Sequence, residues 1–332
     1  MKKSLLALAV LGAFAGVAQA QTSVTIYGSF DGGVRHLTNV NAAGDSNWTV
    51  DSRGTYNNNR LGFKGVEDLG GGLNAHFVLE SGFMSGSGKQ DVAGTLFQRT
   101  ASVGLGGAWG SLDIGRQYSV NFKTIGSYDP FSYKYTGIVP LAAQGGLTRL
   151  DNDLQYTGTF GAVTVRAEHA FGEQAGSFSN AATNAVGATY AEGAITVGGA
   201  FTQRKNSVGT PASYQDQRNW TLGGAYTTGP VRVALGYADN KQDQSATTQT
   251  RTKDWWLGGS YAVSAETALT AGYYETKSTP VAGADVKSKL FIVGGTYALS
   301  KRTNLYADID NRRFDNGTAT QNGLSAGINH LF

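Results

Sequence analysis

The 332-residue chain carries 27 Lys and Arg against 24 Asp and Glu, with no cysteine, five prolines and 47 glycines. It has no apolar run of about 20 residues, which excludes a helical membrane protein. Its 16 tyrosines and 15 phenylalanines, with only 15% charged residues, exclude a disordered chain. The lack of cysteine excludes a disulfide scaffold, a thiol enzyme and a thiolate metal site. We therefore expect a long β protein rich in glycine and aromatic residues.

Residues 1–20 predict a cleaved signal peptide. Lys2 and Lys3 form a basic start, residues 5–18 are apolar but too short to span a bilayer, and Ala18-Gln19-Ala20 provides the small residues of a cleavage site. A buried N-terminal helix is the alternative. Cleavage after Ala20 would remove both lysines and leave residues 21–332, with 25 basic residues against 24 acidic. That balance implies no bulk polyanion, and hence no nucleic acid, as a partner.

From Val24 onward the dominant pattern is an alternation of apolar and polar residues. In residues 24–31, Val24, Ile26 and Phe30 share one face and polar side chains fill much of the other. Residues 163–168, 195–204 and 231–237 repeat the pattern. Such alternation is typical of half-buried β-strands, and the frequent glycines argue against helices.

The connections between these segments alternate in length. Short turns fall at 69–72, 107–110, 159–161, 192–193, 228–230 and 299–302, and long polar connections fall at 38–58, 84–95, 118–149, 173–181, 205–217, 241–252, 278–287 and 314–321. Bacterial outer-membrane barrels have an even number of strands, with short turns at one end and long loops at the other. The pattern predicts about sixteen strands of roughly ten residues in one domain over residues 21–332.

A soluble all-β repeat protein is the alternative to this barrel. It would not need aromatic residues clustered near the strand ends. The sequence places aromatic residues there, as in the two girdles of a membrane barrel: Trp109, Tyr118, Tyr226, Tyr237, Trp255, Trp256, Tyr261, Tyr297 and Phe332.

The charged residues of the strands share the polar face. Arg35 follows Asp31 on the first strand, and Arg60 and Lys64 alternate with apolar neighbours. A lipid-facing Arg or Lys near the bilayer midplane would cost about 2 to 4 kcal/mol, so these faces are expected to line a water-filled pore. Arg99 breaks the alternation, and we expect a bulge or a loop edge there to turn it inward.

No motif predicts an enzyme, a metal site or another cofactor. Residues 323–327 match G-x-S-x-G, but that motif needs a following helix and a later triad histidine, and only five residues remain. The four histidines lie far apart without metal-ligand spacing. A barrel that only displays an enzymatic or adhesive site remains the alternative to a pore.

Several segments resemble one known family. Residues 23–28, 60–70, 115–118 and 300–306, with the terminal Phe332, are similar to the general, non-specific porins of β-proteobacteria of the Burkholderia, Bordetella and Neisseria type. The resemblance covers the whole chain. It implies an all-β fold, a sixteen-stranded antiparallel transmembrane β-barrel with an inward-folded constriction loop at about 118–149. It also implies a homotrimer in the Gram-negative outer membrane, in contact with lipopolysaccharide.

The resemblance also implies site residues and a function. The family's pore arginines map onto Arg60, Arg99 and Arg149, facing a loop whose carboxylate is Asp129. Such an eyelet would be net positive, and the pore would pass ions and small hydrophilic solutes passively with a preference for small anions. The alternative is that the arginines only brace the loop. Phe332 would be the recognition signal for the barrel-assembly machinery, or else only an aromatic anchor.

Overall fold

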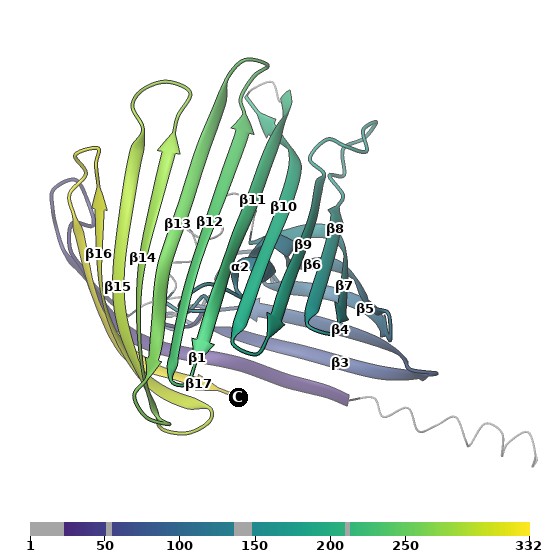
Figure 1. Cartoon of the computed structure of the whole chain (residues 1–332), viewed down its shortest axis with the longest axis horizontal. Helices are drawn as coiled ribbons and strands as arrows, with labels where there is room; N and C mark the ends of the chain where they lie inside the picture. Colours follow the sequence, from purple (N-terminus) through teal and green to yellow (C-terminus); the bar gives the residue numbers. More distant parts are fainter. Residues whose placement is uncertain (1–22, 51–54, 136–147, 210–212) are drawn as a thin grey trace, which may run out of the picture.

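A computed structural model describes residues 23–50, 55–135, 148–209 and 213–332. The predicted signal peptide lies outside these residues, as do positions 136–147 of the predicted constriction loop. The described chain is a single antiparallel sheet that closes on itself (Figure 1). In the described ranges, no helix is both long and apolar enough to cross a lipid bilayer.

Sixteen long strands form the sheet in the described part of the chain. They are β1 (Ser23–Leu37), β3 (Arg60–Gly70), β4 (Leu73–Gly82), β5 (Thr100–Gly107), β6 (Gly110–Tyr118), β7 (Arg149–Phe160), β8 (Val163–Ala170), β9 (Thr183–Glu192), β10 (Ile195–Val208), β11 (Ser213–Thr228), β12 (Val231–Asp243), β13 (Gln249–Ala262), β14 (Thr267–Thr279), β15 (Val286–Ala298), β16 (Thr303–Phe314) and β17 (Gln321–Leu331). The short strand β2 (Asn47–Val50) pairs with the end of β1, and the helix α2 (Val120–Ile125) follows β6.

Strand β1 closes the barrel because it pairs with neighbours at both ends of the chain. Its first half pairs with β3, and its second half pairs with β17 from Ser29↔Leu331 to Leu37↔Gly323. Gly28 and Phe332 exchange backbone hydrogen bonds of 3.0 and 3.2 Å at the seam. A closed sheet leaves no unpaired edge, as lipid requires. The predicted sixteen-stranded antiparallel barrel is confirmed.

The alternation in the sequence separates the two faces of the wall. Phe30 is 47% exposed on the outer face, whereas its neighbour Asp31 is fully buried inside. The expected aromatic girdle is wrong at two positions. Tyr118 stacks inside the barrel on Phe122, and Trp256 is 1% exposed beneath an inward loop. Trp256 follows the outward-facing Trp255, and adjacent strand residues must point to opposite faces.

The alternation of short and long connections is present in part of the structure. The predicted long connections 205–217, 241–252 and 278–287 are too wide, because strands β10 to β15 extend into them and leave 209–212, 244–248 and 280–285 between the strands. The turn from β3 to β4 takes Gly70, Gly71 and Gly72 through φ values of 80°, 61° and 80°, a region that favours glycine. The turns after β5, β7, β9 and β11 leave two residues between the strands, those after β13 and β15 leave four, and all lie at the same end of the barrel. We call this the short-turn end. The long loops lie at the opposite end, except for the connection from β6, which enters the barrel.

A candidate constriction inside the barrel

The segment after β6 folds into the barrel as the short helix α2. The Ser119 side chain caps the helix by accepting from the Phe122 amide at 3.2 Å. Glu168 on the wall strand β8 accepts from the Val120 amide at 2.9 Å, which satisfies another free amide of the first turn. The helix packs against β9 and β10 (Figure 1). This helix is not among the elements predicted from the sequence, although it follows Ser119, and serine is a preferred helix N-cap.

Beyond α2 the loop is fixed to the opposite wall by buried hydrogen bonds. Tyr274 on β14 donates to Asp129 Oδ1 at 2.8 Å. Arg232 on β12 donates to the backbone oxygens of Asp129 and Ser127 at 3.1 and 3.0 Å. The Tyr128 hydroxyl lies 2.8 Å from that of Thr221. These contacts fasten the loop to strands β11, β12 and β14.

Asp129 is the loop carboxylate predicted for the eyelet. It is fully buried, and it also accepts from the Tyr133 amide at 2.8 Å. Burial raises the pKa of Asp129, while its hydrogen bonds from Tyr133 and Tyr274 oppose the rise. The structure therefore makes Asp129 an anchor of the loop rather than a partner of the predicted arginines.

A second segment enters the barrel from the connection between β1 and β3. The buried Asp31 accepts from the amides of Tyr56 and Asn57 at 3.2 and 2.7 Å and from the Tyr306 hydroxyl at 2.6 Å. The Tyr135 amide donates to the Tyr56 oxygen at 2.7 Å. The two inward segments therefore support each other. This second inward segment is not among the features predicted from the sequence.

The three predicted pore arginines converge at one level of the wall. Arg60 begins β3, Arg149 begins β7, and Arg99 lies directly before β5. All three strands run from there to the short-turn end, so their first residues lie at a similar height. Arg99 lies at a loop edge, as expected from its break in the alternation.

Glu80 on β4 and Tyr118 at the end of β6 hold these arginines together. Arg99 Nε lies 2.6 Å from Glu80 Oε1, and Arg60 Nη1 lies 3.9 Å from the same oxygen. Arg99 and Arg149 both donate to the Tyr118 hydroxyl, at 2.7 and 2.6 Å. We call Arg60, Arg99, Arg149, Glu80 and Tyr118 the arginine cluster. It holds three cations and one carboxylate.

A stack of planar groups joins the arginine cluster to the loop. The Arg149 guanidinium lies 4.1 Å from the centre of the Tyr118 ring. Tyr118 stacks on Phe122 of α2 at 4.7 Å, and Phe122 stacks on Tyr133 at 4.0 Å. Cation–π and aromatic stacking favour such arrangements. The stack fixes the loop beside the positive wall.

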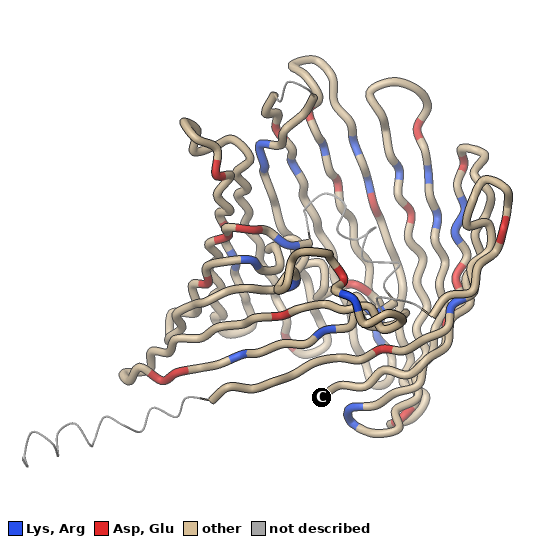
Figure 2. The backbone as a smooth tube through the Cα atoms, turned by 180° about the vertical axis from the view of Figure 1, so that it is seen from behind, with Lys and Arg blue, Asp and Glu red and all other residues tan. Residues whose placement is uncertain are grey.

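The other two predicted cations lie apart from the cluster's ion pairs. Arg35 pairs with Asp310 at 2.8 Å and lies 3.8 Å from Asp308, on the side of β16. Lys64 lies 5.4 Å from the centre of the Tyr27 ring and only borders the cluster. Charges of both signs follow the strands around the barrel (Figure 2). The cluster is therefore a local excess of positive charge in a mixed wall.

Known proteins are similar to this chain in sequence and in architecture. A family model described as Gram-negative porin matches residues 7–317. An outer membrane porin protein of Bordetella pertussis is 46% identical over 144 residues, which are 40% of this chain and 37% of that protein. Outer membrane porin protein 32 of Delftia acidovorans is 36% identical over 231 residues, 65% of this chain and 64% of that protein. The matches thus span less than two thirds of the length of either relative.

The solved structures agree with the fold. The anion-selective porin from Comamonas acidovorans superposes with a TM-score of 0.83 at 27% identity, over 94% of this chain and 100% of that one. A trimer form of OmpT from Vibrio cholerae gives 0.72 at 18% identity, over 94% and 99%, which shows a likeness of fold alone. Since the family model matches most of the sequence and the barrel is closed, this chain belongs to the Gram-negative porin family.

Proposed function

We propose that this porin is a passive, water-filled pore that favours small anions over cations. The observation that carries the proposal is the arginine cluster, in which three guanidinium groups have, among the residues that the structure describes, one carboxylate, Glu80, as their close acidic partner. The name of the similar Comamonas acidovorans structure, an anion-selective porin, supports the same preference. The relatives are porins, which favours a channel over a barrel that displays an enzymatic or adhesive site.

The selectivity follows from the position of these charges. We infer that a permeating ion passes close to the part of the wall that carries Arg60, Arg99 and Arg149. Protein walls of low dielectric constant focus the field of these charges into the water of the pore. Selectivity depends on charge at the narrowest point and not on the nearly balanced total charge of the chain. The cluster thus lowers the energy of an anion and raises that of a cation.

The proposal includes the assembly and export of the protein. We infer that residues 1–20 are removed during export and that the barrel forms a homotrimer in the outer membrane, in contact with lipopolysaccharide. OmpT, which shares the fold, is known in a trimer form. Phe332 is 45% exposed on the outer face and closes the seam at Gly28, so it is accessible to the barrel-assembly machinery as a terminal signal.

Planar-bilayer recordings test the proposal. Wild-type protein should insert with ohmic conductance steps that occur in groups of three. The double variant Arg60→Ser, Arg99→Ser should lose most of its anion preference because one cation, Arg149, would then face Glu80. Electrically silent insertion would reject the pore. An unchanged reversal potential in the double variant would reject the arginine cluster as the selectivity element and favour a bracing role.

A further inference from the structure

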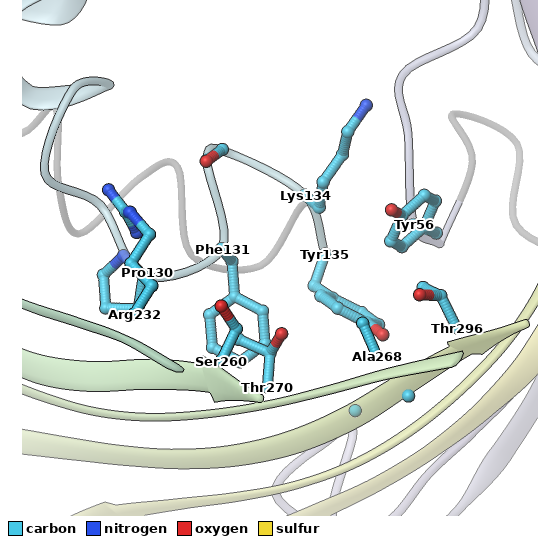
Figure 3. Close-up of a pocket in the computed structure, with 13 residues that line it drawn as sticks. Tyr56, Pro130, Phe131, Lys134, Tyr135, Arg232, Ser260, Ala268, Thr270 and Thr296 are labelled. Atoms are coloured by element: carbon cyan, nitrogen blue, oxygen red, sulfur yellow. The ribbon is translucent and has the colours of Figure 1, made fainter. Parts of the chain in front are cut away.

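The pocket between the inward loop and the wall belongs to the loop anchor. It is bounded by loop residues 130–135 and by wall residues that include Ser260 and Thr270 (Figure 3). Its aromatic residues Phe131 and Tyr135 are each 4% exposed, and their ring centres lie 5.1 Å apart. The two rings fill the space between loop and wall, so they hold the loop in place and offer no surface to a ligand.

Another pocket, of about 410 Å³, opens on the outer face of the wall. It is lined by five residues of three neighbouring strands: Tyr273 on β14, Lys289 and Phe291 on β15, and Asn311 and Arg313 on β16. Alternate residues of a strand share a face, and on this face Leu269 of β14 and Ile309 of β16 are 50% and 56% exposed. Phe291 itself is 49% exposed, so its ring is open to a ligand. We call this site the outer pocket.

The outer pocket lies where the apolar band of the wall meets the polar long-loop end. On the outer face of β15, Phe291 is followed toward the long loop by Lys289, and on β16 Ile309 is followed by Asn311. Phe291 and Asn311 are paired in register, so the change occurs at one level. The Lys and Arg residues of β14 to β16 all lie in the long-loop half of these strands (Figure 2). Because the long loops of outer-membrane barrels are extracellular, the pocket faces the headgroups of the outer leaflet.

The two cations of the outer pocket lie side by side on neighbouring strands. Lys289 and Arg313 are directly opposite each other in the register of β15 and β16. Like charges in this position destabilise a sheet. Among the described residues neither cation forms an ion pair, and Glu275, opposite Lys289 on β14, accepts from the Tyr273 hydroxyl at 3.2 Å. An anion bound between the two cations would remove their repulsion.

Side-chain hydrogen bonds orient Arg313 for an anion. Its Nε donates to Asn311 Oδ1 at 2.9 Å, and Asn311 Nδ2 donates to Asn322 Oδ1 on β17 at 2.6 Å. The terminal N–H groups of Arg313 make no hydrogen bond within the part of the chain that the structure describes, so they are available to a ligand. The planar guanidinium group matches a phosphate group with two parallel hydrogen bonds.

We propose that the outer pocket binds a phosphate group of lipopolysaccharide. Arg313 and Lys289 hold the phosphate, and an acyl chain of the same molecule packs against the exposed ring of Phe291. A free phosphate ion would use the two cations but leave the ring without a contact. The inference rests on the proposed function, which includes contact with lipopolysaccharide, and it assigns that contact to a defined site.

The test is native mass spectrometry of detergent-solubilised protein that has been refolded without lipopolysaccharide and then mixed with diphosphoryl lipid A. We expect wild-type protein to bind lipid A and to bind lipid A without its phosphate groups at least tenfold more weakly. Lys289→Gln and Arg313→Gln should each weaken binding of diphosphoryl lipid A about tenfold, the loss expected for one charge-assisted hydrogen bond. Lys289→Arg should keep most of the binding.

The matched control is the double variant Lys301→Gln, Arg302→Gln. It removes one lysine and one arginine from an exposed turn at the short-turn end, whereas Lys289→Gln, Arg313→Gln removes the same charges from the outer pocket. Both double variants should keep the chloride conductance of the wild type, which shows that they fold. Equal affinity of the two double variants for lipid A would overturn the inference.

The remaining outcomes separate the ligand sources and the proposed function. Equally tight binding of phosphatidylglycerol, or displacement of lipid A by millimolar inorganic phosphate, would show a general anion site and overturn the inference. Binding to monomers but not to trimers would show that a partner subunit covers the pocket, and would also overturn it. Wild-type protein that conducts chloride but binds no lipid A would overturn the inference and leave the pore intact. Protein that binds lipid A but forms no channels would instead contradict the proposed function.

Discussion

Arg60→Gln is the most informative single change in the arginine cluster. The Arg60 side chain is 24% exposed, whereas Arg99 is 3% exposed and forms the tighter ion pair with Glu80. The contacts of Arg60 are one ion pair of 3.9 Å and two hydrogen bonds of 3.2 Å, to Asn57 and Asn58. Its removal should therefore take away one pore charge while Arg99, Glu80 and Tyr118 stay in place.

The expected magnitude follows from Coulomb's law. A permeating ion about 6 Å from a guanidinium group interacts with it by about 0.7 kcal/mol in a water-like dielectric, and 0.1 M salt reduces this to about 0.4 kcal/mol. The interaction has opposite signs for an anion and a cation, so their free-energy difference changes by about 0.8 kcal/mol. The anion-to-cation permeability ratio should fall about fourfold.

The assay is the zero-current potential of Arg60→Gln across a potassium chloride gradient, with Lys301→Gln as the control for loss of a distant charge. The difference from wild type should shrink in 1 M salt, where the screening length falls to about 3 Å. A permeability ratio equal to that of wild type at low salt would refute the reasoning. Equal effects of both substitutions would show a general charge effect rather than a local one.

Three further predictions concern the loop and the barrel seam. Burial lowers the pKa of Lys134 to about 8, and the like charge of Arg60 adds to this. Lys134 is thus charged below pH 8 and neutral above it, so the anion preference should fall between pH 7 and pH 9. A Lys134→Gln pore should show no such step, and a step of equal size in that variant would contradict the assignment. Tyr274→Phe leaves the buried Asp129 without one hydrogen bond and should lower the free energy of unfolding in urea by about 1 to 3 kcal/mol; an unchanged midpoint and slope would show that the loop anchor contributes nothing. Gly28→Ala would place a Cβ 2.5 Å from the Arg60 backbone oxygen, so the folded band on an unheated gel should be lost at a lower temperature; a transition at the wild-type temperature would rule out close packing at this seam.

The barrel could be predicted because its main physical constraint acts on every strand. Lipid on one side and water on the other force the alternation seen at Phe30 and Asp31, and short turns need the glycines at 70–72. The irregular backbone at Arg99 could also be predicted from the sequence. Strict alternation would place this charge at a lipid-facing position, so the strand must be interrupted there. The three arginines that converge in the structure are predicted by the resemblance to a family and not by the alternation alone.

The interior was less predictable because its contacts join residues far apart in the sequence. Asp129 accepts from Tyr274, 145 positions later. The same alternation applies to a residue that faces water and to one that faces an inward loop, so Trp256 could not be recognised as loop-facing. The role of Glu80 as the carboxylate beside the arginines depends on the pairing of β4 with its neighbours. The alternation of polar and apolar residues along each strand is enough to predict the barrel wall. The contacts of the inward loop can be identified only once the folded structure is known.

The most direct test of anion selectivity is the zero-current potential of the wild-type pore across a tenfold gradient of potassium chloride at low ionic strength. The measurement needs no variant and depends on the sign of the charge at the narrowest point. The arginine cluster predicts a potential that lies toward the equilibrium potential of chloride. A potential toward that of potassium would contradict a net positive constriction.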